Sequence, residues 1–185
     1  MINIFLNNRF LVLYVSPFVL GLLSTISFQP FNYTIINFVI FPLIFFFIVY
    51  INKKSKSVYR KRPYKKNFFL FGLLFGFGFY LSGISWITNS LTFDDKFKIL
   101  IPFALILIPL ILSLFMAFTI LVIGPFLNYN LQSLFIFSGS LAFSDYLRSK
   151  VLTGFPWNMW AYSTNWMVEF IQILNIIGLN AYNLI

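Results

Sequence analysis

Residues 10–52 read FLVLYVSPFVLGLLSTISFQPFNYTIINFVIFPLIFFFIVYIN and contain no charged side chain. Because a helix needs about 20 apolar residues to cross a bilayer, this run is long enough for two spans. Gln29-Pro30-Phe31-Asn32 breaks the helical pattern near its centre. The run therefore predicts a membrane hairpin with spans over about 10–28 and 33–51. A cleaved signal peptide is the rival for the first span, but no small-residue cleavage site follows it.

The composition of the whole chain places it in the same class. Hydrophobic residues make up 60% and charged residues 9% of the 185 positions, and the mean hydropathy is +0.89. These values predict an all-α polytopic membrane protein. The chain has no cysteine and no histidine, which excludes disulfides, thiolate metal sites, a cysteine nucleophile and a Ser-His hydrolase. We expect neither a metal nor a cofactor.

Residues 52–67, NKKSKSVYRKRPYKKN, hold eight of the 13 lysines and arginines. By the positive-inside rule this segment predicts a cytoplasmic loop. The N-terminus is then also cytoplasmic, and the hairpin turn at Pro30 lies on the outer side. Such a loop attracts anionic lipid headgroups, so the net charge of +9 does not indicate a nucleic-acid partner.

Four further spans are expected, over about 68–91, 99–123, 131–147 and 166–185, the last of them unfinished at Ile185. Gly72 and Gly76 form a small-xxx-small pair in the third span, which predicts close helix packing rather than ligand contact. Asp145 and Arg148 are spaced i, i+3 at the end of the fifth, so we expect a helix-surface ion pair. Thr164 and Asn165 are candidate caps for the sixth.

Residues 148–164, RSKVLTGFPWNMWAYST, form the candidate site. Their helix-breaking Thr153-Gly154-Phe155-Pro156 predicts a re-entrant or interfacial turn near 149–164 on the outer side. Irregular backbone at membrane depth is tolerated only inside protein or beside a wet cavity. Trp160 and Trp166 are expected to be interfacial anchors, whereas Trp157 suits an anchor and a site equally well.

These motifs, taken in order, resemble the membrane domain of the bacterial apolipoprotein N-acyltransferases. The resemblance lies in Phe28-Gln29-Pro30-Phe31, GFGFYLSGISWI from Gly76 to Ile87, Asp145-Tyr146-Leu147-Arg148, LTGFPW from Leu152 to Trp157, and Ala161-Tyr162-Ser163. It implies a multi-pass protein of the inner membrane whose family moves an acyl chain from a phospholipid, through a cysteine thioester, to the N-terminal amine of an apolipoprotein.

The resemblance also separates two parts of such an enzyme. The family's catalytic Glu, Lys and Cys belong to a nitrilase-like domain, so no catalytic residue is expected in these 185 residues, and we expect this polypeptide alone to be inactive. The mouth through which lipid enters would be lined by Trp86, Arg148, Thr153, Gly154, Phe155, Pro156, Trp157 and Tyr162. Arg148 or Lys150 would meet a phosphate. A small transporter or channel subunit, or a membrane assembly protein, are the alternative interpretations.

Overall fold

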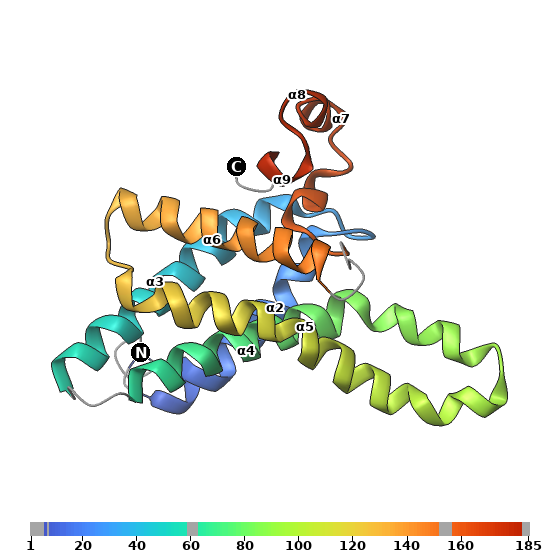
Figure 1. The fold of residues 1–185 in the computed structure, drawn as a ribbon, viewed down its shortest axis with the longest axis horizontal. Coiled ribbons are helices and arrows are strands. Elements are labelled where there is room, and N and C mark those ends of the chain that lie inside the picture. Colours follow the sequence, from blue (N-terminus) through green and yellow to red (C-terminus); the bar gives the residue numbers. More distant parts are fainter. Residues whose placement is uncertain (1–5, 7, 59–62, 152–156, 183–185) are drawn as a thin grey trace.

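A computed structural model of the chain describes residue 6 and residues 8–58, 63–151 and 157–182. Within these ranges all regular structure is helical, which confirms the all-α class. The first helical segment joins a π-helical turn, Leu11–Val15, to α2, Ser16–Ser24, and to a 3-10 turn, Thr25–Ser27. A 3-10 turn, Thr34–Ile36, begins the second segment and leads into α3, Asn37–Val58. The chain reverses between the two segments (Figure 1).

The next two helices form a long hairpin. Helix α4, Pro63–Ile84, continues as a 3-10 helix, Ser85–Thr92. A second 3-10 helix, Asp95–Leu100, leads into α5, Ile101–Ile123, which ends in the 3-10 turn Gly124–Phe126. The closed end of this hairpin projects beyond the other helices (Figure 1).

Helix α4 is the centre of the bundle, because it packs against both α2 and α5. A Cβ on Gly72 would lie 2.7 Å from the Met116 carbonyl oxygen, and one on Gly76 would lie 2.9 Å from the Ser113 Cα. Both distances are too short for a side chain, so the small-xxx-small pair serves close packing against α5. Four phenylalanines of α4, each at most 1% exposed, contribute to the core: Phe68, Phe71, Phe75 and Phe79.

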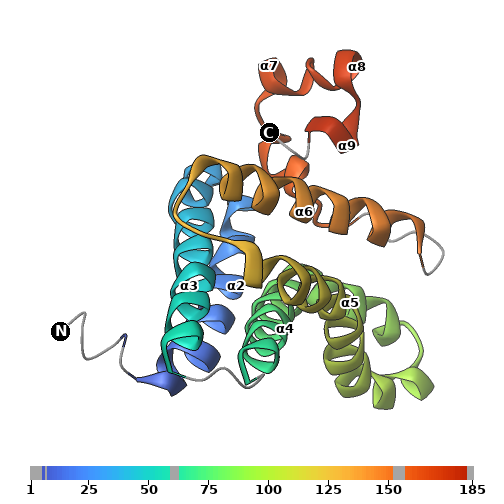
Figure 2. The same cartoon turned by 60° about the vertical axis from the view of Figure 1, so that its left-hand side comes forward.

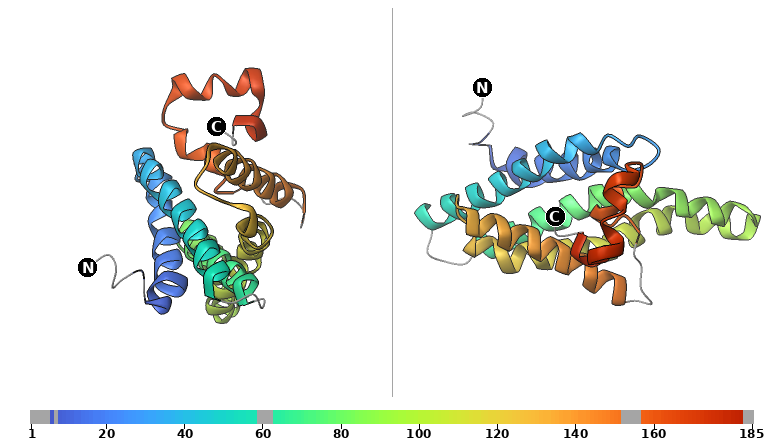
Figure 3. Two further views of the ribbon diagram at one scale, coloured as in Figure 1. Left: turned by 90° about the vertical axis from the view of Figure 1, so that its left-hand side faces the viewer. Right: turned by 90° about the horizontal axis from the view of Figure 1, so that it is seen from above.

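The remaining helices lie across one side of the bundle. Helix α6, Leu131–Lys150, is capped by Asn130, whose side chain accepts a 2.9 Å hydrogen bond from the Ser133 amide. It runs across the bundle above α5, and the chain after it lies on its far side (Figures 2 and 3). That last part consists of a 3-10 helix and three short helices: Trp160–Thr164, α7 Val168–Ile171, α8 Leu174–Ile177 and α9 Leu179–Tyr182.

Length and hydropathy support three membrane spans in the described part of the chain, at Thr34–Ser55, Lys65–Thr92 and Asp95–Phe126. The helix Leu11–Ser27 is apolar but shorter. Helix α6 has 20 residues, but its serines, Asp145 and Arg148 lower its hydropathy. Three candidate spans in the described part of the chain support a multi-pass membrane protein, and the six expected spans stay a prediction.

The helix bounds after residue 165 differ from the expected sixth span. Residues 166–182 do not form one helix: α7, α8 and α9 have four residues each, and Gly178 separates the last two with a φ of 77°. Such a φ cannot continue a right-handed helix. Neither Thr164 nor Asn165 caps α7, because its N-cap is Met167.

Residues 52–67 also differ from the expected loop, since α3 extends to Val58 and α4 already begins at Pro63. Lysine is a good helix former and proline is favoured in a first helical turn. Lys54 adds a contact that holds the extended end of α3: its Nζ lies 3.4 Å from the Leu6 carbonyl oxygen, to which it donates a hydrogen bond.

Candidate functional site

A cavity of about 670 Å³ lies at the end of the bundle opposite the lysines of α3 and α4. Three segments form it: the turn between the first two helical segments, the end of α4, and the chain after α6. Its described lining consists of Thr25, Phe28, Gln29, Pro30, Phe31, Ser82, Gly83, Ser85, Trp86, Trp157, Asn158, Tyr162 and Asn165. None of these residues is charged, so the cavity offers no counter-charge to an ionic ligand.

Three of the aromatic residues predicted from the sequence meet at this cavity. The rings of Trp86 and Trp157 stand edge to face, with 5.1 Å between their centroids, and Tyr162 is half-buried nearby. Both tryptophans remain about half exposed, at 48% and 49%. The predicted residues Thr153, Gly154, Phe155 and Pro156 lie outside the described part of the chain.

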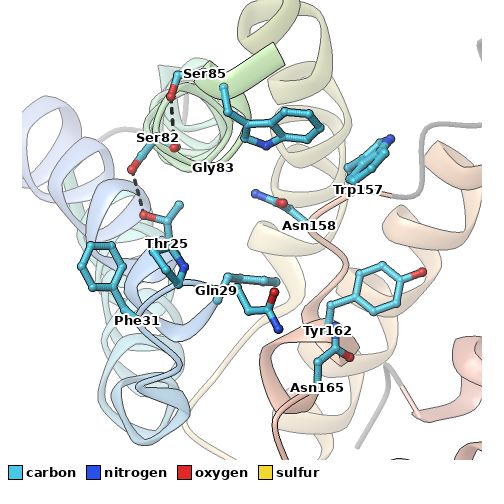
Figure 4. Close-up of a pocket in the computed structure, with 13 residues that line it drawn as sticks. Thr25, Gln29, Phe31, Ser82, Gly83, Ser85, Trp157, Asn158, Tyr162 and Asn165 are labelled. Carbon is cyan, nitrogen blue, oxygen red and sulfur yellow. Dashed lines mark hydrogen bonds between the residues drawn. The ribbon is translucent and has the colours of Figure 1, made fainter. Parts of the chain in front are cut away.

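The polar side chains of the cavity are neutral hydroxyls and amides. The Thr25 and Ser82 hydroxyls lie 2.8 Å apart and share a hydrogen bond, and the Ser85 hydroxyl donates to the Ser82 carbonyl oxygen at 3.5 Å (Figure 4). Gln29 and Asn165 face the same space (Figure 4). Aromatic walls with scattered neutral hydrogen-bonding groups suit an uncharged, largely apolar ligand portion.

Arg148 does not line the cavity but is buried beneath it. Its side chain is 1% exposed, its Nη2 lies 3.0 Å from Asp145 Oδ1, and its Nη1 donates a 2.6 Å hydrogen bond to the Trp157 carbonyl oxygen. The guanidinium also lies over the Tyr80 ring, 5.3 Å from its centroid. The expected surface ion pair is therefore wrong, because this face of α6, with Leu141 and Ser144, is turned into the protein.

The Asp145–Arg148 pair holds both ends of a short piece of backbone. Arg148 binds the carbonyl of Trp157, and Asp145 Oδ2 accepts a 3.3 Å hydrogen bond from the amide of Trp160. Both Nη atoms of Arg148 are therefore engaged inside the protein, and its contact with a phosphate stays a prediction. Lys150, the other predicted phosphate partner, is exposed on α6.

Trp160 is a core residue, which makes its expected role as an interfacial anchor wrong. It is 6% exposed, and its ring stacks on Phe79 with centroids 4.6 Å apart and meets Phe41 edge-on at 4.7 Å. Trp166 is 48% exposed, and its Nε1 donates a 2.9 Å hydrogen bond to the Thr34 hydroxyl. Trp160 therefore packs its segment against the core, and Trp166 connects it to the start of the second helical segment.

Ser163 makes a further connection to that part of the molecule. Its hydroxyl accepts a 3.1 Å hydrogen bond from Asn37 Nδ2, and its carbonyl oxygen accepts one from the Thr34 hydroxyl. Residues 157–166 are thus fixed to α6 on one side and to the start of α3 on the other. This is how the fold presents Trp157 and Tyr162 to the cavity.

Sequence reasoning missed the polar lining, namely Thr25, Gln29, Ser82, Ser85, Asn158 and Asn165. A signal was present: these residues interrupt or end apolar runs on what the charge distribution predicts to be one side of the membrane. In the described part of the chain no group of three or more acidic, histidine or cysteine side chains could hold a metal ion.

Comparison with known proteins connects this geometry to a family. Residues 20–185 match the model described as the apolipoprotein N-acyltransferase N-terminal domain. The chain belongs to this family. Its membership decides against the transporter and assembly-protein alternatives, and every described cavity residue falls within the matched range.

Individual relatives agree with the family match. The apolipoprotein N-acyltransferase of Brucella suis biovar 1 is 29% identical over 168 residues, which is 89% of this chain and 31% of that protein. The Rickettsia typhi enzyme of that name is 34% identical over 165 residues, 88% of this chain and 30% of that protein. The one from Rickettsia bellii is 38% identical over 109 residues, 58% of this chain and 22% of that protein. The chain spans less than a third of the length of these relatives.

Proposed function

We propose that this chain is the membrane part of an enzyme that transfers an acyl chain from a phospholipid to the N-terminal amine of the diacylglyceryl-cysteine of a lipoprotein. The observation that carries the proposal is the uncharged, aromatic-walled cavity in a chain of the acyltransferase family. Its role is to admit and orient a lipid acyl chain at the membrane surface. Trp86, Trp157 and Tyr162 line this cavity, and Thr153, Gly154, Phe155 and Pro156 are assigned to its entrance by the motif resemblance alone.

The distribution of charge supports an orientation for this site. Lys53 and Lys54 near the end of α3, and Lys65 and Lys66 near the start of α4, mark one end of the bundle. The positive-inside rule assigns that end to the cytoplasm. The cavity at the opposite end then faces the outer leaflet of the bacterial inner membrane, and the N-terminus is cytoplasmic.

The proposed transfer needs this cavity to position the lipid and a cysteine thiol to react with it. A cysteine thiolate attacks the ester carbonyl of the phospholipid, a thioester forms, and the glycerol oxygen leaves with a proton. The lipoprotein amine then attacks the thioester, so that an amide forms and the thiol is released. None of these 185 residues is a cysteine, so the part proposed for them is positioning, which makes both attacks effectively intramolecular.

Lipid entry can be tested on the purified chain in nanodiscs that contain phosphatidylglycerol with a photoreactive group in its acyl chain. We expect cross-links at Trp86 and Tyr162 that fall about tenfold in Trp157→Ala, because the aromatic wall is lost. Cross-links at Phe103 and Phe118, which are exposed on α5, serve as the control and should not change. Equal labelling of the cavity in both proteins would contradict lipid binding there.

The transfer itself can be tested with a chimera in which residues 20–185 replace the matching segment of the Rickettsia typhi relative. We expect the chimera to add one acyl chain to the N-terminus of a diacylated lipoprotein, measured by mass spectrometry. Trp157→Ala in the chimera should slow this addition. If the chimera has the same unfolding temperature as the unaltered relative but transfers no acyl chain, the result argues against the proposed function.

A further inference from the structure

Asn158 has an unusual position at the wall of the cavity. Its backbone φ is 53°, a left-handed conformation that asparagine tolerates better than most residues. Its side-chain Nδ2 is buried and has no hydrogen-bond partner in the described part of the protein. The amide points toward Gly83 at the end of α4 (Figure 4). Shape rather than hydrogen bonding therefore holds this side chain.

Gly83 provides the space that the Asn158 side chain fills. A Cβ built on Gly83 would overlap Asn158 Nδ2, and the next atoms that it would meet are Asn158 Cγ at 3.2 Å and Thr25 Cγ2 at 3.4 Å. The Thr25 distance is an ordinary contact. Of the three nearest atoms, the two that a methyl group at position 83 would crowd belong to Asn158, so the Asn158 side chain would have to shift.

This fit lies directly beside the tryptophan pair. Trp157 precedes Asn158, and Trp86 follows Gly83 by three residues, so the same two segments meet twice. One contact is the Asn158 side chain in the space at Gly83. The other is the edge-to-face pair of Trp86 and Trp157, whose ring centroids lie 5.1 Å apart. The Trp157 carbonyl is held from below by Arg148. Arg148 thus holds the Trp157 backbone, and Trp86 contacts its ring.

We propose that Gly83 and Asn158 form a positioning pair: the asparagine side chain, seated on the glycine, sets Trp157 against Trp86 and thereby sets the shape of the cavity entrance. The effect on lipid binding rests on the proposed function, whereas the pairing itself does not. Neither residue is required to touch the reacting atoms.

Four forms of the full chain test the pairing: wild type, Gly83→Ala, Asn158→Gly and the double variant. Glycine retains the left-handed backbone at position 158 while it removes the side chain. Affinity is measured for phosphatidylglycerol with brominated acyl chains, which quench tryptophan fluorescence. A variant with Trp86→Phe and Trp157→Phe gives the signal of the other tryptophans. The melting temperature is measured on the same samples.

We expect Gly83→Ala to weaken lipid binding about tenfold and Asn158→Gly about threefold, because small displacements of a binding group are costly. The double variant should bind like Asn158→Gly, since Thr25 Cγ2, at an ordinary contact distance of 3.4 Å, is then the nearest of these atoms to the added methyl. Gly76→Ala, which acts against α5, is the matched control, and its effect should multiply with that of Asn158→Gly.

Two outcomes would separate the claims. If Gly83→Ala is as harmful with Asn158→Gly as without it, in both affinity and melting temperature, the positioning pair is refuted. If the wild type shows no quenching beyond the signal of the Trp86 and Trp157 variant, lipid binding at the cavity is refuted. The melting temperatures of the four forms then still decide whether the two positions are coupled.

Discussion

Two ion pairs with the same spacing in sequence occupy opposite environments. Asp95 and Lys98 lie in the projecting hairpin, 2.6 Å apart, with side chains 90% and 54% exposed. Asp145 and Arg148 lie beneath the cavity, 3.0 Å apart, with side chains 1% exposed. The shorter pair lies within a single 3-10 helix, whereas the longer one holds the backbone of Trp157 and Trp160. Burial and additional hydrogen bonds, not distance, decide what an ion pair does.

The largest effect should come from Arg148→Met. It leaves the Asp145 carboxylate buried without its cation and the Trp157 carbonyl without its donor, so we expect a loss of about 3–5 kcal/mol in the free energy of unfolding. Denaturant unfolding in detergent measures it, and Lys150→Met on the exposed side of the same helix is the control. Equal losses in the two variants would remove the distinction between a buried pair and a surface charge.

An intermediate effect is expected when both partners are replaced, in Asp145→Leu with Arg148→Met. No charge is then buried alone, and the loss should shrink to about 1–3 kcal/mol, because the Trp157 carbonyl and the Trp160 amide still lack partners. We also expect Arg148→Met to weaken lipid quenching, and the double variant to weaken it equally, since Trp157 is not held in either variant. Recovery of binding together with stability would show that the pair does not position the tryptophan.

A small effect is expected in the projecting hairpin. Lys98→Ala removes an exposed pair, and such pairs contribute less than about 1 kcal/mol. The same unfolding experiment checks it, with Lys96→Ala beside it as the control for loss of a lysine. A larger loss would mean that the hairpin is covered in the membrane and that Lys98 is not in water.

The smallest and most discriminating difference is the response to salt. Between about 0.1 and 1 M NaCl the Debye length falls from about 10 Å to 3 Å. The stability difference between wild type and Lys98→Ala should therefore vanish at high salt, while that between wild type and Arg148→Met stays. If the stability difference between wild type and Arg148→Met fell with salt, the Asp145–Arg148 pair would have to be accessible to water.

The helical class could be predicted from the sequence, but the burial of individual charges could not. Uncharged runs predicted the helical class because a bilayer excludes charge and unpaired backbone alike. The i, i+3 spacing could not distinguish the two ion pairs, since burial depends on which face of α6 meets its neighbours. Helix formation by the lysines beyond Asn52 was missed for a related reason: charge fixes the side of the membrane but does not end a helix.

The site was predicted in part. Trp86, Trp157 and Tyr162 were chosen from motif resemblance, and the fold brings them to one cavity. Arg148 was chosen for its charge, which the structure uses internally. Asn158 could not have been found, because its role depends on a left-handed backbone and on the space at Gly83, which lies 75 positions away in the sequence.

The hydrogen bonds between residues 163–166 and the start of the second helical segment have a consequence for folding. They join positions separated by 126 to 132 residues. During synthesis, Thr34 and Asn37 leave the ribosome long before Ser163 and Trp166 exist, so the cavity is completed after the helices that flank it. Contacts of such high sequence separation form slowly. Thr34→Val should therefore delay maturation of the site in pulse-chase proteolysis and leave insertion of the earlier helices at its normal rate.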